Sequence, residues 1–233
     1  MDKVAFITYK DSPALSDSDI LLVEPMAKYG YEVVPAAWDD ETIDWTQYHS
    51  LVFRSCWNYH YNTEKFKTWL DKLEQLKVKA WNPLKIVKWN LNKFYLDDLS
   101  KSQAIKTIPT VYIKQGETAN LKMVMKKSSW NEVVIKPAIG ASAYKIFKTA
   151  ISEAEQNQKS FDELVSAVDV MVQPLIPELV KHGETSMIFI NKKFSHAVNR
   201  SPKSGDYRSN YEFGGRENRI NDLDKNIIQA GKS

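Results

Sequence analysis

The stretch VVIKPAIGASA, residues 133–143, joins an apolar run to a lysine and then to a series of small residues. The run Val133–Ile135 predicts a buried strand that ends at Lys136. Small residues let backbone N–H groups approach a phosphate, and a lysine adds a positive charge to such a site. The G-x-x-x-x-G-K-[ST] pattern of a Walker A loop is absent. The stretch alone therefore leaves two interpretations open, a phosphate-binding loop or a tight hairpin with an incidental lysine.

The composition limits the class of protein. The chain has 233 residues, 43% of them hydrophobic and 26% charged, which predicts a packed globular core and excludes disorder. A net charge of +3 gives no electrostatic footprint for nucleic acid unless the positive charge is clustered. The single cysteine, Cys56, excludes an intrachain disulfide, and no apolar run has the length of a membrane span or signal peptide. We therefore expect a cytoplasmic protein with no membrane or nucleic-acid partner.

The first third of the chain alternates strands and helices, which predicts a small parallel α/β lobe over residues 1–82, ending at Asn82-Pro83. The expected strands are 4–9, 31–38 and a run that begins at residue 51, and the expected helices are 20–30 and 62–78. Five apolar residues share one face of the second helix: Phe66, Trp69, Leu70, Leu73 and Leu76.

The rest of the chain predicts two α+β lobes, residues 83–173 and 174–233. The fold class is thus α/β followed by α+β. In the first of these lobes we expect a helix over 88–103, a strand over 108–113, a short helix over 121–129, a hairpin of strands 131–137 and 143–149, a helix over 161–168 and a strand over 170–177. In the second we expect two long antiparallel strands over 183–202 that turn at Asn191-Lys192, a loop over 203–216 and a helix over 220–230.

Further residues suited to nucleotide chemistry surround Lys136 in a fixed order. Asn92-Lys93 comes about 40 residues earlier, and VMVQPLIPEL, Gly183-Glu184, Arg200 and GDYRSNYEFGG (205–215) follow. This series resembles the ATP-grasp superfamily, in the branch of glutathione-synthetase-like and RimK-like ligases. RSCWNYHY followed by WNPLKIVKWNLNKFYLDDL resembles a subgroup related to D-cycloserine ligase.

The resemblance covers essentially the whole chain and implies an ATP-grasp fold behind an N-terminal Rossmann-like lobe, with ATP as cofactor. By the same resemblance, Lys93 on its helix reaches the nucleotide phosphates and Lys136 binds the α- and β-phosphates. The loop with Gly140, Ala141 and Ser142 folds over them. A surface position on a solvated helix remains the alternative for Lys93.

The resemblance also assigns the hinge and the ribose site. Gln173 and the backbone near Pro174, Leu175 and Ile176 would read the adenine edge, and Glu184 would accept hydrogen bonds from the ribose hydroxyls. For Glu184, a plain strand-end charge remains the alternative.

The implied catalytic residues are Arg200, Arg208 and Asn210. Arg200 would lie near the transferring phosphoryl group, and Arg208 and Asn210, with Gly214 and Gly215, would surround the γ-phosphate. Phosphoryl transfer needs positioned cations rather than a covalent nucleophile, which suits this set. A surface ion pair remains the alternative for Arg200.

A polar and aromatic segment, RSCWNYHY (54–61), follows the third expected strand. Ligands bind beyond the carboxyl ends of such strands. Arg54 could hold a substrate carboxylate, while Ser55, Trp57 and Asn58 could shape the pocket. An aromatic anchor between lobes is the alternative.

The chain departs from the ATP-grasp pattern near its end. That pattern continues to an Asp and a Glu-x-Asn strand that ligate Mg²⁺, which the resemblance implies as a second cofactor. Here the late carboxylates Glu212, Glu217, Asp222 and Asp224 lack that setting, so we assign no metal ligand. The four histidines show no metal-site spacing either. We expect an incomplete last lobe with an exposed sheet edge or apolar face, which favours self-association as a homodimer.

Two functions follow from these expectations. The first is an ATP-dependent ligase that joins a small-molecule carboxylate to an amine through an acyl phosphate, with activity impaired by the missing metal-binding segment. The second is a non-catalytic nucleotide-binding or scaffold protein with the same fold. A transferase that uses a nucleotide sugar would suit the first lobe alone, and the later lobes argue against it.

Overall fold

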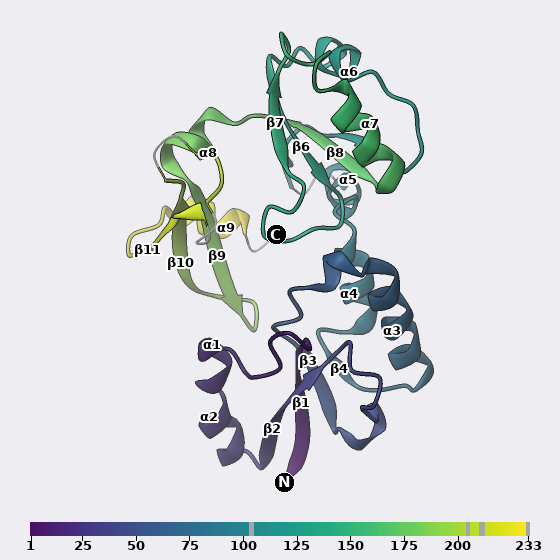
Figure 1. Cartoon of the computed structure of the whole chain (residues 1–233). Coiled ribbons are helices and arrows are strands. Elements are labelled where there is room, and N and C mark those ends of the chain that lie inside the picture. The colour runs from purple at the N-terminus through teal and green to yellow at the C-terminus, as the bar shows by residue number, and fades with distance from the viewer. Residues whose placement is uncertain (103–104, 204–205, 210–212, 232–233) are drawn as a thin grey trace. The chain divides into compact units, whose positions relative to one another are not determined.

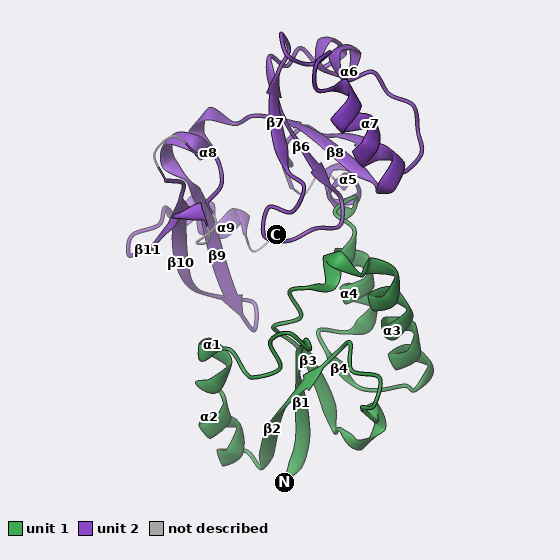
Figure 2. Cartoon of the chain, in the orientation of Figure 1, with its two compact units in different colours: residues 1–95 green, residues 96–233 purple. Residues whose placement is uncertain are grey.

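The computed structural model of the chain describes residues 1–102, 105–203, 206–209 and 213–231. Two compact units are present, Met1–Tyr95 and Leu96–Ser233, and the division between them falls inside one helix (Figure 2). Within the described ranges, no helix combines the length and the apolar character that crossing a membrane requires.

A parallel sheet of order β2-β1-β3-β4 forms the first unit (Figure 1). Its strands are β1 (Asp2–Thr8), β2 (Tyr31–Ala37), β3 (Ser50–Phe53) and β4 (Ala80–Trp81). The run Val4–Thr8 of central strand β1 is buried throughout, which explains why it reads as continuously apolar up to its final threonine. The sequence-based expectation of a parallel α/β sheet here is confirmed.

The helices of the first unit cover this sheet. They are α1 (Asp17–Ile20), α2 (Val23–Lys28), α3 (Thr63–Gln75) and α4 (Leu84–Leu91), with short 3₁₀ helices η1 (Trp45–Gln47) and η2 (Tyr59–Tyr61). Four of the five predicted apolar residues of α3 are buried, namely Phe66, Trp69, Leu70 and Leu73. Leu76 is 40% exposed because it lies beyond the last helical residue, so its predicted place on the buried face is wrong.

Two predicted helices are each divided in two. The segment 20–30 breaks at Leu21 and Leu22, and Pro25 falls in the first turn of α2, where a missing N–H is tolerated. The segment 88–103 contains only the end of α4, which begins at Leu84, and then α5 (Tyr95–Lys101). A turn separates the two helices, and there the Asn92 side chain accepts a hydrogen bond from the Phe94 N–H at 3.0 Å. The turn therefore carries Lys93, which does not lie on a helix.

The second unit contains an antiparallel sheet of order β5-β8-β6-β7. Its elements are β5 (Val111–Ile113), α6 (Leu121–Lys127), β6 (Glu132–Pro137), β7 (Phe147–Ala150), α7 (Gln158–Ala167) and β8 (Val170–Pro174). Val133 and Ile135 of β6 belong to one core cluster with Leu121 of α6 and Phe161 of α7. The predicted hairpin of β6 and β7 is confirmed, but β7 starts only at Phe147 because residues 142–145 form a turn.

The same unit contains a three-stranded antiparallel sheet of order β11-β10-β9. Its elements are α8 (Pro177–His182), β9 (Glu184–Ile190), β10 (Lys193–Ser201), β11 (Arg216–Ile220) and α9 (Lys225–Ala230). The predicted turn at Asn191-Lys192 is confirmed, and both residues have the left-handed φ that a tight hairpin needs. Strand β11 was not predicted, because RENRI lacks an apolar alternation and is a strand only through its pairing with β10.

Candidate functional site

Lys136 lies on the face of β6 opposite to its core residues. Side chains alternate along a strand, so Val133 and Ile135 point to the helices while Lys136 points away from them. The side chain is half-buried, and within the described residues no carboxylate lies within ion-pair distance of its ammonium group. Burial lowers the pKa of Lys136, and the negative charge of Glu184 offsets part of that effect. A half-buried cation without an ion-pair partner is suited to an anionic ligand.

The loop after β6 is a turn with an unusual backbone. Ser142, Ala143 and Lys145 have φ values of 48°, 55° and 52°, in the left-handed region that side chains disfavour. Gly140 has an ordinary φ, and an added Cβ there would meet nothing nearer than 3.8 Å. Strained backbone of this kind gathers at ligand-binding loops. Of the predicted residues 140–142 only Ser142 has it, and their role stays a prediction.

Arg200 lies between two carboxylates in the three-stranded sheet. It pairs in register with Glu184 of β9 and with Glu217 of β11, so the three side chains share one face. Its Nε donates a hydrogen bond to Glu217 Oε1 at 2.6 Å. Since Glu184 also acts on Lys136, the structure brings together three of the predicted residues, Lys136, Glu184 and Arg200. Sequence reasoning had left Glu217 without a role.

Arg208 is held by its own loop. Its Nε and Nη2 donate to the two carboxylate oxygens of Asp206 at 3.0 and 2.8 Å, and the guanidinium lies 3.7 Å from the centre of the Phe213 ring. Hydrogen bonds from Arg208 hold the pKa of the Asp206 carboxyl well below its usual range. The Lys148 ammonium of β7 lies over the Tyr207 ring, which joins this loop to the four-stranded sheet. The predicted Asn210 lies outside the described residues.

The predicted hinge begins where β8 ends at Pro174, and Pro177 then starts α8, so the strand is shorter than the 170–177 predicted. Gln173 is buried and its amide donates to Thr110 Oγ1 at 2.7 Å. The Leu175 N–H donates to the Glu132 carbonyl at 2.9 Å. The Gln173 side-chain amide and the Leu175 N–H thus already have partners in the protein, and the adenine-binding role stays a prediction.

Lys93 belongs to the first unit, in the turn between α4 and α5. Its positive charge contributes to the lowered pKa of His60, of which burial is the larger cause. Its predicted contact with the nucleotide phosphates remains a prediction.

The predicted substrate residues lie in the segment after β3. Arg54 Nε donates to Asp19 Oδ1 at 2.6 Å, and Ser55 Oγ donates to Asp19 Oδ2 at 2.7 Å. Asn58 is buried, whereas Trp57 is 53% exposed. Sequence reasoning missed Asp19, which precedes Arg54 by 35 residues and offers no local signal.

Metal ligands are not gathered in the described part of the chain. No group of three His, Cys, Asp or Glu side chains within those ranges is arranged to hold a metal ion. Glu217 is engaged with Arg200, as described above. The described residues therefore present no preformed cluster of three such ligands, and a magnesium ion bound together with a nucleotide would take most of its ligands from phosphate and water.

Comparison with known protein families identifies the superfamily of this chain. Residues 97–231, more than half of the chain, match the family model described as the prokaryotic glutathione synthetase ATP-grasp domain. The chain belongs to the ATP-grasp superfamily. Residues 4–82 match the family model of the N-terminal domain of D-cycloserine synthetase DcsG. The ATP-grasp resemblance and the mixed α/β fold class predicted from the sequence are thereby confirmed.

Individual relatives agree with this ATP-grasp assignment. The chain is 26% identical over 183 residues to cycloserine biosynthesis protein DcsG of Streptomyces lavendulae, covering 77% of this chain and 60% of the relative. It is 32% identical over 94 residues to glutathione synthetase of Prochlorococcus marinus subsp. pastoris, covering 39% and 30%. These matches thus span 60% or less of the relatives' lengths.

Solved structures share the ATP-grasp fold. D-cycloserine synthetase DcsG superposes with a TM-score of 0.83 at 23% identity, over 99% of this chain and 78% of that one. D-alanine–D-alanine ligase from Bacillus anthracis, complexed with ATP, gives 0.61 at 15% identity, over 100% and 76%. The ATP-grasp ligase PsnB, complexed with its minimal precursor, Mg and ADP, gives 0.55 at 12% identity, over 98% and 78%.

Proposed function

We propose that this ATP-grasp protein is an ATP-dependent ligase that joins a small-molecule carboxylate to an amine. The γ-phosphoryl group of ATP passes to the carboxylate oxygen, which gives ADP and an acyl phosphate. The amine then attacks the acyl carbon, a C–N bond forms, and phosphate leaves with the C–O bond electrons while the amine loses a proton. The observation that carries the proposal is Lys136, a half-buried cation without an ion-pair partner among the described residues, in a domain of this family.

The charged residues near Lys136 have different roles in this proposal. In it, Lys136 binds phosphate oxygens and Glu184 accepts hydrogen bonds from the ribose hydroxyls. The negative charge of Glu184 also acts on the Lys136 ammonium, which supports a shared site. Arg200, fixed by Glu217, stabilises charge on the transferring phosphoryl group. Arg208, on its loop, binds the γ-phosphate. Its guanidinium then divides its hydrogen bonds between Asp206 and the ligand.

We expect magnesium to bind together with the nucleotide, because the solved complex of the ATP-grasp ligase PsnB contains Mg and ADP. Bound magnesium neutralises charge on the β- and γ-phosphates. Because the described residues contain no cluster of three metal-binding side chains, we assign magnesium no protein ligand and no step.

A second function is favoured by the arginines. Arg200 and Arg208 already have carboxylate partners, which suits a protein that binds nucleotide without turning it over. Calorimetry with ATP, with and without Mg²⁺, combined with a coupled assay of ADP release in the presence of amino acids and small carboxylates, separates the two. Substrate-dependent ADP release supports the ligase, and binding without release supports the second function. If ATP does not bind at all, both are wrong.

Self-association as a homodimer is a separate proposal. Strand β9 forms one edge of the three-stranded sheet in the described part of the chain, and an open edge can pair with a second copy. Light scattering coupled to size-exclusion chromatography gives the mass in solution directly, and a mass of one chain would refute the dimer.

A further inference from the structure

Three polar segments meet at the carboxyl-terminal edge of the first sheet. Lys10 follows β1, Asp39 follows β2 and Arg54 follows β3, and β1 lies between the other two strands. The Lys10 N–H donates to Asp39 Oδ1 at 2.8 Å, and the Ser55 N–H donates to the Ile7 carbonyl at 2.9 Å. These bonds join the strand ends across the edge where ligands of parallel sheets bind.

Arg54 is fixed at this edge by one side of its guanidinium. Its Nε is bound to Asp19, a carboxylate only 1% exposed that is also held by Ser55. The two terminal nitrogens of Arg54 make no hydrogen bond or ion pair within the described residues, and the side chain is 40% exposed. The free end of a guanidinium presents two parallel N–H donors, a geometry that matches a carboxylate.

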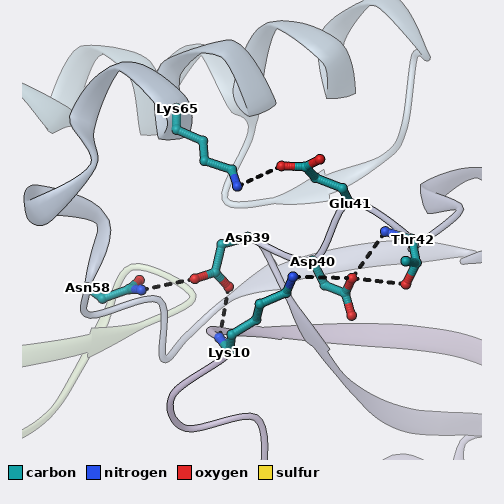
Figure 3. Close-up of polar contacts among 7 residues, drawn as sticks. All are labelled: Lys10, Asp39, Asp40, Glu41, Thr42, Asn58 and Lys65. Carbon is teal, nitrogen blue, oxygen red and sulfur yellow. Dashed lines mark hydrogen bonds and ion pairs between the residues drawn. The ribbon is translucent and has the colours of Figure 1, made fainter.

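Asp39 is the one of three consecutive carboxylates that lacks a cationic partner among the described residues (Figure 3). Asp40 lies 3.8 Å from the Lys10 ammonium, and Glu41 accepts from Lys65 at 2.8 Å. Asp39 has no lysine or arginine within ion-pair distance in that part of the chain. The Lys65 charge acts on Asp39 only from beyond that distance, so the carboxylate can still take a cation in direct contact.

The orientation of Asp39 is nevertheless fixed. Asn58 donates to Asp39 Oδ2 at 3.1 Å (Figure 3). The Trp38 indole N–H holds Asn58 in turn by a hydrogen bond of 2.6 Å to its Oδ1. With the Lys10 N–H on Oδ1, each carboxylate oxygen has one donor and keeps capacity for a second. An ammonium group offers three donors and a positive charge, so it matches this acceptor.

We infer that this edge binds a small zwitterion carrying a carboxylate and a protonated amine, as a free amino acid does. The terminal nitrogens of Arg54 hold the carboxylate, Asp39 holds the amine, and Asp19 is the positioning residue of Arg54. Asp39 and Arg54 follow β2 and β3, strands that lie two strand spacings or about 10 Å apart, and the two side chains do not pair with each other. The inference deepens the proposed function by naming the class of one substrate.

Calorimetry on the intact chain tests this directly. The probes are the common amino acids in L and D form, followed by the decarboxylated amine and the deaminated acid that match the tightest binder. We expect both analogues to bind at least about tenfold more weakly, since each leaves one fixed charge of the site without its partner.

Variants then assign each charge to its residue. Arg54→Lys keeps the positive charge but loses the paired N–H donors of the guanidinium. It should therefore weaken binding of the amino acid about tenfold and leave binding of the decarboxylated amine unchanged. Asp39→Asn should weaken the amino acid and leave the deaminated acid unchanged. Asp19→Asn should act like Arg54→Lys, discriminating against the carboxylate only. Asp40→Asn, a paired neighbour, is the matched control and should change binding by less than about twofold.

Several results would overturn the inference: no amino acid binding at about 10 mM, analogues that bind as well as the amino acid, or variants that weaken both analogues alike. The analogue comparison uses the unaltered protein, so a variant that fails to fold does not obscure it. Amino-acid binding without ATP binding would leave this inference standing and refute the proposed function. If ADP release is unchanged when Arg54 or Asp39 is replaced, this inference is refuted and the proposed function stands.

Discussion

Replacing Lys136 by Met removes the charge from the candidate phosphate site and keeps most of the side-chain length. The ammonium is half-buried, and burial lowers its pKa despite the nearby Glu184. The substitution should therefore have two opposite effects: weaker nucleotide binding, and a more stable protein in the absence of nucleotide.

The magnitudes follow from the surroundings of Lys136. A hydrogen bond to a charged group contributes about 1.5–3 kcal/mol, so affinity for ATP should fall roughly ten- to hundredfold. Removing a partly desolvated charge should stabilise the fold by about 1 kcal/mol, which raises Tm by roughly 2–4 °C for a chain of this size.

The stability gain should also depend on pH. The pKa of Lys136 in the folded state lies below its usual 10.5, so the folded chain holds that proton less tightly than the unfolded chain does. The penalty is complete below the lowered pKa and disappears as pH rises from there toward 10.5. The difference in Tm between the two proteins should therefore be constant near neutral pH and shrink in alkaline buffer.

Thermal unfolding and calorimetry with ATP measure both effects on the same samples. Lys127→Met is the matched control, because Lys127 is exposed on α6 and has no ion pair within the described residues. It should change Tm by less than about 1 °C and leave ATP affinity unaltered. A Lys136→Met protein that is less stable, yet binds ATP as well as the parent, would show that Lys136 is a structural residue and that the phosphate site is wrongly placed.

Two further predictions concern the backbone and the cysteine. Gly183→Ala should destabilise the chain by at least about 2 kcal/mol, because Gly183 has φ +76° and an added Cβ would lie 2.2 Å from the Arg200 carbonyl oxygen. Urea unfolding measures this, and Gly140→Ala, which meets no close atom, is its control; equal effects of the two would contradict the steric argument. Burial raises the pKa of Cys56 to about 11, so the thiol stays protonated at neutral pH and should react with iodoacetamide far more slowly than free cysteine. The rate should rise about tenfold per pH unit and level off only above about pH 11, because the thiolate is the reacting form. Alkylation at pH 8 as fast as that of free cysteine would contradict the raised pKa.

Local patterns in the sequence were sufficient for most of the fold. The continuous apolar run of β1, the 3.6-residue spacing of α3 and the hairpin residues Asn191-Lys192 each carry their signal within a few positions. The errors fall where the signal is not local. Strand β11 is polar and exists only because β10 pairs with it, and the turn around Asn92 divides a segment whose composition favours one helix.

The candidate site shows the same contrast between local and non-local information. The sequence by itself determined the kinds of residue present and, through their order, the superfamily, since Lys136, Glu184 and Arg200 occur in a recognisable series. Only the tertiary structure decided which charges have partners. Asp19 pairs with Arg54, which lies 35 residues later in the chain. Glu217 pairs with Arg200 from β11, a strand that the sequence did not predict. Lys136 has no ion-pair partner among the described residues. Ion pairing depends on distances of a few ångströms between residues far apart in the chain, and those distances exist only once the strands have paired.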